Sequence, residues 1–440
     1  MPLVRRRLRV SARLIAVTVA AVLAAVVVPA QAAPAASGIA VSKYFFGMHD
    51  SKPESWPKAK VGALRLWDAG VSWREIEKTP GVYDFARLES EVTAARAHGA
   101  EITLVLGQTP TFWEAGVVRP GCDTAPTNAY CSRYGQGASS VPNPDAYFNY
   151  VHALAVQFHG RITALQVWNE ANVPGYWAGS ATDMAQLTFV AAAAVRDVNK
   201  TYGTSTKLVS PGFVARSNNG FIDRYFAAKP AGSAVANFLD VVGLSLYPSA
   251  AGGPEDSMTV LSNVRAIMAK RKVSKPIWNT EINYGLAAGG TGKKPPAISS
   301  QRQAAYIVRT FLLNANARVA RVFWYAWDLK TIGNTMMTSG SSDTPTAASK
   351  AFGLTQSWMA GSKLTGCARY KRGAYKGTYV CTLKYSGGVK RVFWNPTKRL
   401  RMTMPSTTTY RITLSGKKLK LKHSAKLTVD YRPVLVRSKH

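Results

Sequence analysis

The chain has 440 residues, a formal net charge of +33 and four cysteines. This length exceeds what a single hydrophobic core usually holds, so we expect one large domain and a smaller one. The six histidines are scattered, with His98, His152 and His159 on expected helices, and no cysteine spacing resembles a metal site. Composition therefore gives no support for a metal centre, and we expect no cofactor.

The N-terminal segment has the pattern of a secretory signal. Five arginines precede an apolar stretch from Leu14 to Val28, and small residues follow at Ala30 and Ala32. We expect residues 1–33 to be a cleaved signal peptide, which implies a secreted protein without stable membrane insertion. The alternative is an uncleaved anchor, although the apolar run is short for a bilayer span.

Eight short apolar runs lie between residues 43 and 361. They are residues 44–50, 63–68, 102–107, 162–170, 207–213, 240–248, 276–285 and 321–328. Their nearly continuous hydrophobicity is typical of strands that are covered on both faces, as in a parallel sheet. We therefore expect eight parallel strands.

Most of these runs are separated by segments with apolar residues at helical spacing. One such segment has Thr182 as its expected N-cap, and another begins on the serines at 299 and 300. Strands alternating with helices predict an α/β fold, a closed (β/α)8 barrel over residues 40–361. A doubly wound open sheet is the alternative, but the Gly-rich phosphate loop expected after its first strand is missing.

The pattern changes after Gly361. Short alternating segments separated by turn residues predict a small antiparallel β-sandwich over residues 362–440, packed directly on the barrel. From Ser362 to His440, 20 lysines and arginines accompany a single acid, Asp430. Such a segment favours an anionic polysaccharide or cell-wall polymer as partner, whereas generic solubility or loose envelope attachment explains the charge equally well.

The four cysteines form two close pairs in the sequence, Cys122 with Cys131 and Cys367 with Cys381. In an oxidising compartment each pair can close a short loop, so we expect two disulfides. The first pair lies in a long loop from Thr109 to Pro144, which borders the barrel mouth and should shape one end of a cleft.

Chemistry in such a barrel takes place at the C-terminal ends of the strands. Two glutamates stand out there, because Glu170 and Glu281 each interrupt apolar strand sequence. A pair of carboxyl groups at one mouth fits glycosidic bond cleavage, in which one protonates the leaving oxygen and the other attacks or activates water. Alternatively, the two could pair with Arg65 or cap helices, but matched strand positions beside aromatic residues favour the catalytic interpretation.

The surroundings of this pair are suited to sugar binding. Tryptophans can stack on pyranose faces while amides and hydroxyls contact ring hydroxyls. The expected rim comprises His49, Arg65, Asp68, Gln108, Trp113, Trp168, Asn169, Trp177, Tyr247, Asn279, Trp324 and Trp327.

The motifs "WNE" at residues 168–170 and "WNTE" at 278–281 resemble the signature of the retaining glycoside hydrolases with (β/α)8 barrels, known as clan A. Within that clan, "FFGMHD" and "LRLWDAGVSWREIEKTPGVYDFARLES" are most similar to family 39, which contains β-xylosidases, α-L-iduronidases and exopolysaccharide hydrolases. The similarity extends over residues 44–440 and is weakest in the basic C-terminal segment.

The resemblance implies a role for several residues. Glu170 would be the acid/base and Glu281 the nucleophile, while Asn169 would bind the sugar 2-hydroxyl. Tyr247 would orient Glu281, and Trp324 or Trp327 would form the floor of the subsite. Glu170 needs a raised pKa and Glu281 needs a cation such as Arg65 to stay ionised. Three further residues either brace the rim or touch substrate: His49, Asp68 and Gln108.

We therefore expect a monomeric, secreted enzyme that acts on a carbohydrate. The competing hypothesis is a non-catalytic glycan- or envelope-binding protein on a hydrolase scaffold, since a fold alone does not imply activity. A nucleic-acid partner is disfavoured, because the basic segment lacks an aromatic-basic groove motif and the chain is expected to be exported.

Overall fold

The computed structural model describes residues 38–50, 52, 56–115, 134–135, 137–285, 297–328, 336–339 and 344–438. The expected signal peptide and the expected Cys122–Cys131 disulfide lie outside the described residues. In the described part of the chain, no helix is long and apolar enough to cross a membrane. Residues from Gly38 onward form one compact unit.

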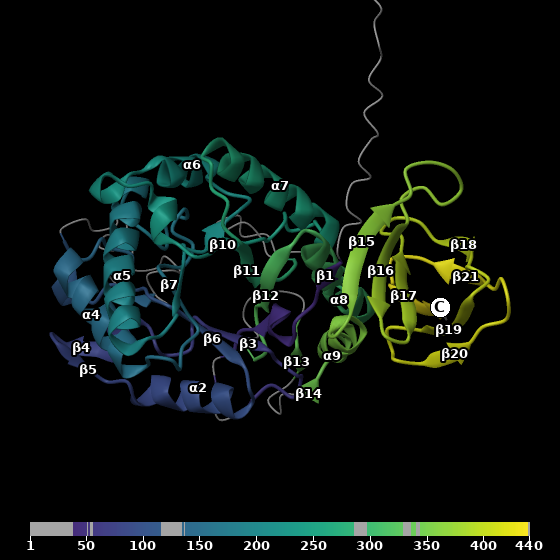
Figure 1. Ribbon diagram of the computed structural model, residues 1–440, viewed down its shortest axis with the longest axis horizontal. Coiled ribbons are helices and arrows are strands. Elements are labelled where there is room, and N and C mark those ends of the chain that lie inside the picture. The colour runs from purple at the N-terminus through teal and green to yellow at the C-terminus, as the bar shows by residue number, and fades with distance from the viewer. Residues whose placement is uncertain are drawn as a thin grey trace, which may run out of the picture. The chain divides into compact units, whose positions relative to one another are not determined.

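The centre of this unit is a parallel barrel (Figure 1). Its strands are β2 (Phe46–Met48), β3 (Ala63–Leu66), β6 (Glu101–Val105), β7 (Ala164–Gln166), β8 (Lys207–Val209), β9 (Phe213–Val214), β10 (Val242–Ser245), β11 (Ile277–Ile282) and β12 (Val319–Trp324). They are hydrogen-bonded in the order β8-β7-β6-β3-β2-β12-β11-β10-β9, and every pairing is parallel.

The barrel closes through the fifth predicted strand, which is divided into β8 and β9. β8 pairs with β7 and β9 pairs with β10, and residues 210–212 connect them. Pro211 has no N–H for a ladder, so the strand breaks there. The two residues beside Pro211 still hydrogen-bond to the neighbouring strand segments on either side. Ser210 N donates to Val241 O, just before β10, and Gly212 N donates to Trp168 O, just after β7, each at 2.9 Å. The predicted (β/α)8 barrel is therefore confirmed.

Helices surround these strands (Figure 1). They are α1 (Trp73–Ile76), α2 (Ala86–Ala97), α4 (Pro144–Gln157), α5 (Ala181–Tyr202), α6 (Asn219–Ala227), α7 (Pro254–Lys270), α8 (Ser300–Asn316) and α9 (Ala347–Met359). Helix α5 begins earlier than predicted: Ser180, rather than Thr182, is the N-cap. Ser180 is favoured as the N-cap because it forms a capping box with Asp183: each side chain accepts a hydrogen bond from the backbone N–H of the other residue.

Shorter elements connect them. The 3-10 helices are η1 (Lys43–Phe45), η2 (Thr111–Trp113), η3 (Pro230–Gly232) and η4 (Val235–Phe238), and the small hairpins are β4 (Glu77–Thr79) with β5 (Val82–Tyr83) and β13 (Thr338–Ser339) with β14 (Thr344–Pro345).

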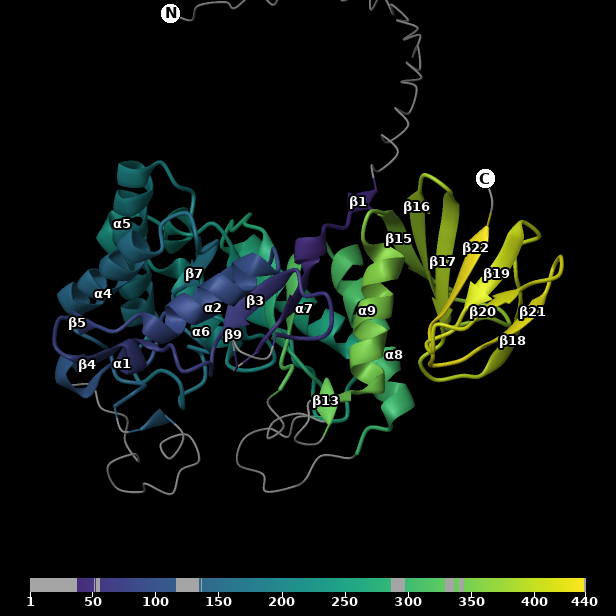
Figure 2. The same cartoon turned by 90° about the horizontal axis from the view of Figure 1, so that it is seen from below.

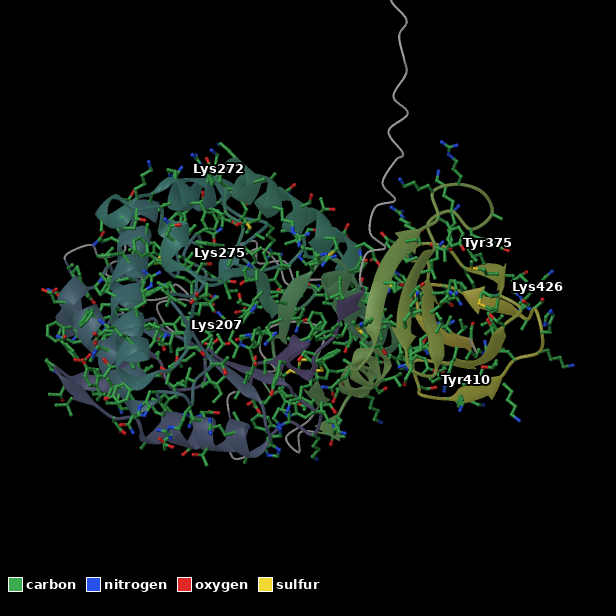
Figure 3. The ribbon with its side chains drawn as sticks, viewed as in Figure 1. Lys207, Lys272, Lys275, Tyr375, Tyr410 and Lys426 are labelled. Carbon is green, nitrogen blue, oxygen red and sulfur yellow. A yellow bond between two sulfur atoms is a disulfide. The ribbon has the colours of Figure 1, made fainter. Side chains whose placement is uncertain are left out.

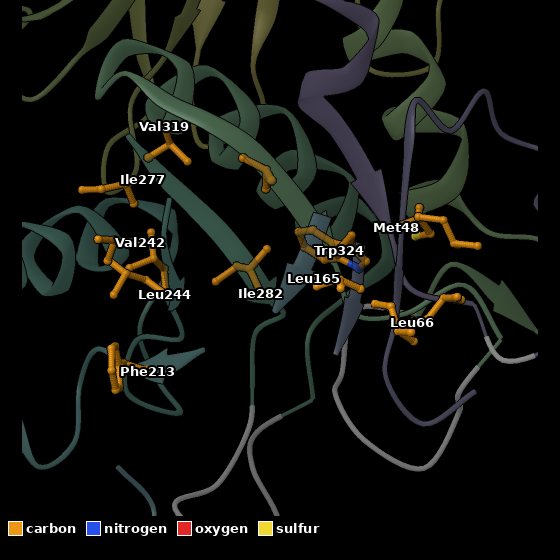
Figure 4. Packing of buried hydrophobic residues seen from close by; sticks show 14 of the residues in the cluster. Met48, Leu66, Leu165, Phe213, Val242, Leu244, Ile277, Ile282, Val319 and Trp324 are labelled. Atoms are coloured by element: carbon orange, nitrogen blue, oxygen red, sulfur yellow. The ribbon is translucent and has the colours of Figure 1, made fainter. Parts of the chain in front are cut away.

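Apolar side chains fill two layers of the barrel. Successive side chains of a strand point to opposite faces, so each strand contributes to both layers. The layer between strands and helices includes Met48, Leu165, Ile282 and Trp324 (Figure 4). A separate cluster fills the barrel interior: Ala63, Ala164, Val209, Val241, Trp278 and Phe323.

The C-terminal segment forms the predicted antiparallel β-sandwich. Its larger sheet has the order β1 (Ile39–Ala40), β15 (Lys363–Arg369), β16 (Tyr379–Tyr385), β17 (Gly388–Trp394), β22 (Val434–Ser438), β19 (Thr408–Ile412) and β20 (Lys418–Lys420). β18 (Leu400–Thr403) pairs with β21 (Lys426–Val429). Apolar side chains of both sheets, such as Phe393 and Met402, pack together.

The sandwich is stapled and attached to the barrel by specific contacts. Cys367 and Cys381 face each other on β15 and β16 and form the predicted disulfide. Trp394 donates from Nε1 to Glu255 Oε1 of α7 at 2.8 Å, and Lys390 Nζ donates to Trp358 O of α9 at 3.0 Å. Figure 2 shows β15–β17 beside α8 and α9. The larger sheet therefore packs directly on the barrel.

Candidate active site

Glu170 follows strand β7 in an uncommon backbone conformation. Its φ is +44°, in the left-handed region that non-glycine residues rarely adopt. The preceding residue, Asn169, still makes a parallel bridge to Gly212. Parallel bridging thus continues beyond the end of β7 as far as Asn169, and the turn at Glu170 leaves its side chain partly buried at the mouth of the barrel.

Glu281 reaches the mouth through an irregularity in strand β11. The register of β11 against β12 shifts between Asn279 and Ile282. Such a bulge redirects a side chain. Thr280 lies close to Gly212 inside the barrel, and the adjacent Glu281 also turns inward, where Arg65 contacts it.

Arg65 on β3 joins the two strand ends. It is fully buried and donates from Nη1 to Glu281 Oε2 at 3.0 Å and from Nη2 to Asn169 Oδ1 at 2.8 Å. Its Nε donates to Gln166 Oε1 at 2.7 Å, and Gln166 in turn donates to Ser210 O. The planar guanidinium therefore fixes the glutamate and the asparagine in one geometry.

A glycine leaves room for this network. A Cβ on Gly212 would lie 3.1 Å from Gln166 Nε2 and 3.5 Å from Arg65 Nη2. Gln166 was absent from the predicted site. Its signal in the sequence is a polar residue inside the apolar run 162–170.

Tyr247, just after β10, holds the other oxygen of Glu281. Its hydroxyl donates to Oε1 at 2.8 Å, and the side chain is buried. Arg216 lies against the ring of Tyr247, with Cζ 5.9 Å from the ring centroid, and also donates to Pro248 O. A phenol and a guanidinium thus contact the Glu281 carboxylate, and a second cation is near.

The electrostatics of the two glutamates differ. Burial and the charge of Glu281 raise the pKa of Glu170 to about 8, against the opposing charges of Arg65 and Arg216. Burial also raises the pKa of Glu281, but the charge of Arg65 and the hydrogen bond from Tyr247 oppose that rise. Arg65 is hydrogen-bonded to Glu281 and not to Glu170. When the pair carries one negative charge, Glu281 is therefore the ionised group and Glu170 holds the proton.

Three aromatic side chains form a wall at the mouth of the barrel. Trp67, Tyr134 and Tyr176 lie with ring centroids 5.6 to 6.3 Å apart. Asp68 accepts from the hydroxyls of Tyr134 and Tyr325, both at 2.7 Å. A cavity of about 260 Å³ lined by Trp67, Asp68 and Gln108 borders the wall. Asp68 therefore fastens the wall in place.

Among the predicted rim residues, Trp324, Trp177 and Asn279 do not reach the cleft. Trp324 is fully buried between strands and helices, because its neighbour Phe323 takes the inward position on β12. Trp177 packs edge-on against Trp168 and donates to Ser180 O. Asn279 bonds Asn314 of α8, because it lies on the outer face of β11.

Other predicted residues brace the site. Trp327 is buried in the main hydrophobic cluster, and its backbone N–H donates to His49 O. His49 is fully buried and donates from Nε2 to Thr280 O at 3.0 Å, and burial and Arg65 lower its pKa well below the usual value. Tyr325, which was not among the predicted residues, packs edge-on against His49. It belongs to the same hydrophobic cluster as Trp67, and Tyr134 and Tyr176 pack against that cluster. Its signal was the aromatic run at 323–325.

The fold and site define a (β/α)8 barrel with a glutamate at the ends of strands β7 and β11, followed by a β-sandwich. The chain is similar to a family 39 glycoside hydrolase from Bacteroides cellulosilyticus, with a TM-score of 0.65 and 18% identity over 91% of this chain and 82% of that chain. A family 39 β-xylosidase from Caulobacter crescentus has a TM-score of 0.60 at 14% identity, covering 92% and 98% of the two chains.

A family 30 endoxylanase from Clostridium papyrosolvens is similar at a TM-score of 0.58 and 13% identity, again covering 92% and 98%. No family model matches the sequence, and neither does any curated protein. At these identities the similarity shows a shared fold, and it extends over barrel and sandwich alike.

Proposed function

We propose that the protein is a glycoside hydrolase that cleaves O-glycosidic bonds by retaining double displacement. The observation that carries this proposal is the asymmetry of the two glutamates. Glu281 accepts hydrogen bonds from Arg65 and Tyr247, whereas burial raises the pKa of Glu170 to about 8. One carboxylate and one carboxylic acid at neutral pH are what this reaction requires.

The first step forms a glycosyl ester. The Glu281 carboxylate attacks the anomeric carbon, the bond to the leaving oxygen breaks, and the proton of Glu170 passes to that oxygen. In the second step Glu170 takes a proton from water, the water oxygen bonds to the anomeric carbon, and the ester to Glu281 breaks. This mechanism requires carboxyl groups about 5 to 5.5 Å apart.

The neighbouring side chains support these steps. Asn169 uses its Oδ1 to accept from Arg65, so its amide N–H groups remain to donate to a sugar hydroxyl. Trp67, Tyr134 and Tyr176 can offer stacking surfaces at the barrel mouth. Because two of the similar structures are a β-xylosidase and an endoxylanase, aryl β-xylosides are the first substrates to test.

The test compares wild type with Glu281→Gln and Glu170→Gln on aryl β-xylosides and on bacterial exopolysaccharides. Glu281→Gln should abolish turnover of every substrate. Glu170→Gln should lose activity on poor leaving groups yet retain the first step with dinitrophenol, which needs no proton. Added azide should then give a glycosyl azide of retained configuration, seen by NMR. Turnover by Glu281→Gln would refute the nucleophile assignment.

A second candidate is a glycan- or envelope-binding protein without catalysis, favoured by the basic sandwich with its 20 lysines and arginines. Under this hypothesis wild type and Glu281→Gln bind glycans equally and neither turns them over. The presence of both glutamates, with Arg65 bonded to Glu281, argues for the enzyme, because a binder needs no such pair.

We also propose that the enzyme is exported as a monomer and contacts an anionic polymer of the envelope through its sandwich. N-terminal sequencing of protein from the culture medium should give a start near residue 33, and an unprocessed N-terminus would refute export by cleavage. Light scattering should give the mass of one chain; one of the similar structures is described as monomeric.

A further inference from the structure

A cavity of about 680 Å³ lies between the barrel and the sandwich, away from the two glutamates. Helices α8 and α9 line one side, and β19, the loop that follows it, β21 and residues 430–434 line the other. This volume is in the range of natural ligand sites.

The cavity lies toward the end of the barrel that holds the two glutamates. Helix α8 follows strand β11 along the chain, and helix α9 follows β12 after the short strands β13 and β14. Both helices therefore begin at the end of the barrel where the C-terminal ends of its strands lie. Gln301 lies in the first turn of α8, and Ala347 and Lys350 lie in the first turn of α9, and all three line the cavity. The cavity is therefore at the same end of the barrel as Glu281.

The lining is positively charged. It contains Lys350, Arg411 and Arg432, and among the described lining residues Asp430 is the only acid, which leaves a net charge of +2 from three cations and one carboxylate. Burial alone would raise the pKa of Asp430, but hydrogen bonds from Arg432 hold that pKa below its usual value. Asp430 is therefore an anion already engaged by Arg432.

The other two cations have no such partner within the described chain. Arg411 Nε is buried and meets no hydrogen-bond acceptor there, which is costly for a charged group. Lys350 is exposed on α9 and forms no ion pair with a described residue. Hydroxyl groups of Thr413, Ser415 and Thr428 also line the cavity and can bond to sugar hydroxyls.

We infer that this cavity is an accessory binding site for an acidic oligosaccharide, whose carboxylates pair with Lys350 and Arg411. The inference deepens the proposed function, since a site at the catalytic end can hold a polymer chain that also enters the cleft. A guanidinium binds carboxylate through two parallel hydrogen bonds, and an ammonium adds a point charge. A neutral glycan offers neither contact.

The test measures binding in the Glu281→Gln background by titration calorimetry, so that catalysis plays no part. The probes are hexagalacturonate and the neutral xylohexaose. We expect hexagalacturonate affinity to fall by more than about tenfold in Lys350→Glu, which removes a charged hydrogen bond and adds a repelling carboxylate. In Arg411→Gln, which only removes a charged hydrogen bond, the affinity should fall by about tenfold. Xylohexaose binding should stay unchanged in both variants.

Lys207→Glu is the matched control. Lys207, which is labelled in Figure 3, is the first residue of β8 and is exposed. It lies at the opposite end of the barrel, and its replacement by glutamate makes the same change in charge. Equal loss of hexagalacturonate affinity in Lys207→Glu would show a general charge effect and overturn the site. So would equal wild-type affinity for the acidic and neutral probes. Lys350 is exposed, so its variant tests the site even where Arg411→Gln impairs folding.

The outcomes separate the two proposals. Acidic-probe binding that depends on Lys350, together with absent glycosidase activity, refutes the enzyme and keeps this site. Glycosidase activity with hexagalacturonate binding that Lys350→Glu leaves intact refutes this site and keeps the enzyme.

Discussion

Arg65 on β3 and Glu281 on β11, 216 positions apart in the chain, meet with 3.0 Å between Nη1 and Oε2. Both side chains are buried, and an unpaired charge in that place would cost several kcal/mol. The pair is stable only because the barrel closes and brings β3, β7 and β11 to one mouth, where Arg65 also holds Asn169.

Replacing Arg65 by lysine should damage catalysis more than folding. Lysine keeps one charge but cannot bond Gln166, Asn169 and Glu281 at once. We expect kcat to fall about 100-fold, equivalent to ~3 kcal/mol of transition-state stabilisation. Tyr247→Phe, which removes a single hydrogen bond to Glu281, should cost about tenfold. A kcat for Arg65→Lys within twofold of wild type would contradict the orienting role.

The pKa of Glu170 should set the alkaline limit of activity. The acid must hold its proton for the first step, and its pKa is about 8, so kcat/KM should decline as the pH rises through that value. Stopped assays from pH 5 to 10 measure this decline. In Glu170→Gln with a dinitrophenyl glycoside, the first step should lose this alkaline limb; a limb that persists would assign it to another group.

The same carboxyl group affects stability in the opposite sense to a salt-bridged acid. Its folded pKa lies above the unfolded value, so the native state binds more protons between the usual glutamate pKa and about 8. Stability should therefore decrease with rising pH across that window. Chemical unfolding at several pH values should show a smaller decrease for Glu170→Gln than for wild type, and an equal decrease would contradict the shift.

Asp68 should control substrate binding through the aromatic wall. Asp68→Asn keeps a residue that tolerates the φ of +60° but weakens the hydrogen bonds from Tyr134 and Tyr325. We expect KM to rise severalfold with kcat little changed, and stability to fall by ~1 kcal/mol. Tyr325→Phe, which removes one of the two bonds, is the control and should show about half this stability loss.

Glu255 should hold the sandwich to the barrel. It accepts from Arg309, which is buried, and from Trp394 of the sandwich. Glu255→Gln leaves a buried guanidinium without its anion, so the free energy of unfolding should fall by ~3 kcal/mol. Glu101→Gln breaks the more exposed pair with Arg321 and should cost ~1 kcal/mol or less. Equal losses in denaturant titrations would show that Glu255 has no special role.

The sequence by itself determined the barrel, the sandwich, the Cys367–Cys381 disulfide and the two glutamates. Continuous apolar runs specify strands that are covered on both faces, and a carboxylate inside such a run marks a strand end that opens to a cleft. The order of strands and helices then follows from short, right-handed connections. These patterns lie within short stretches of the chain, so they can be read from one sequence.

Only the tertiary structure decided which neighbours reach the cleft. Strand alternation points the side chain of Trp324 outward, and the bulge after Asn279 turns that of Glu281 inward. An unbroken apolar run does not show which of its residues face the inside of the barrel. Gln166 and Tyr325 gained their roles from partners on distant strands. Side-chain direction depends on register and closure, which are properties of the assembled sheet and so became visible only in the folded chain.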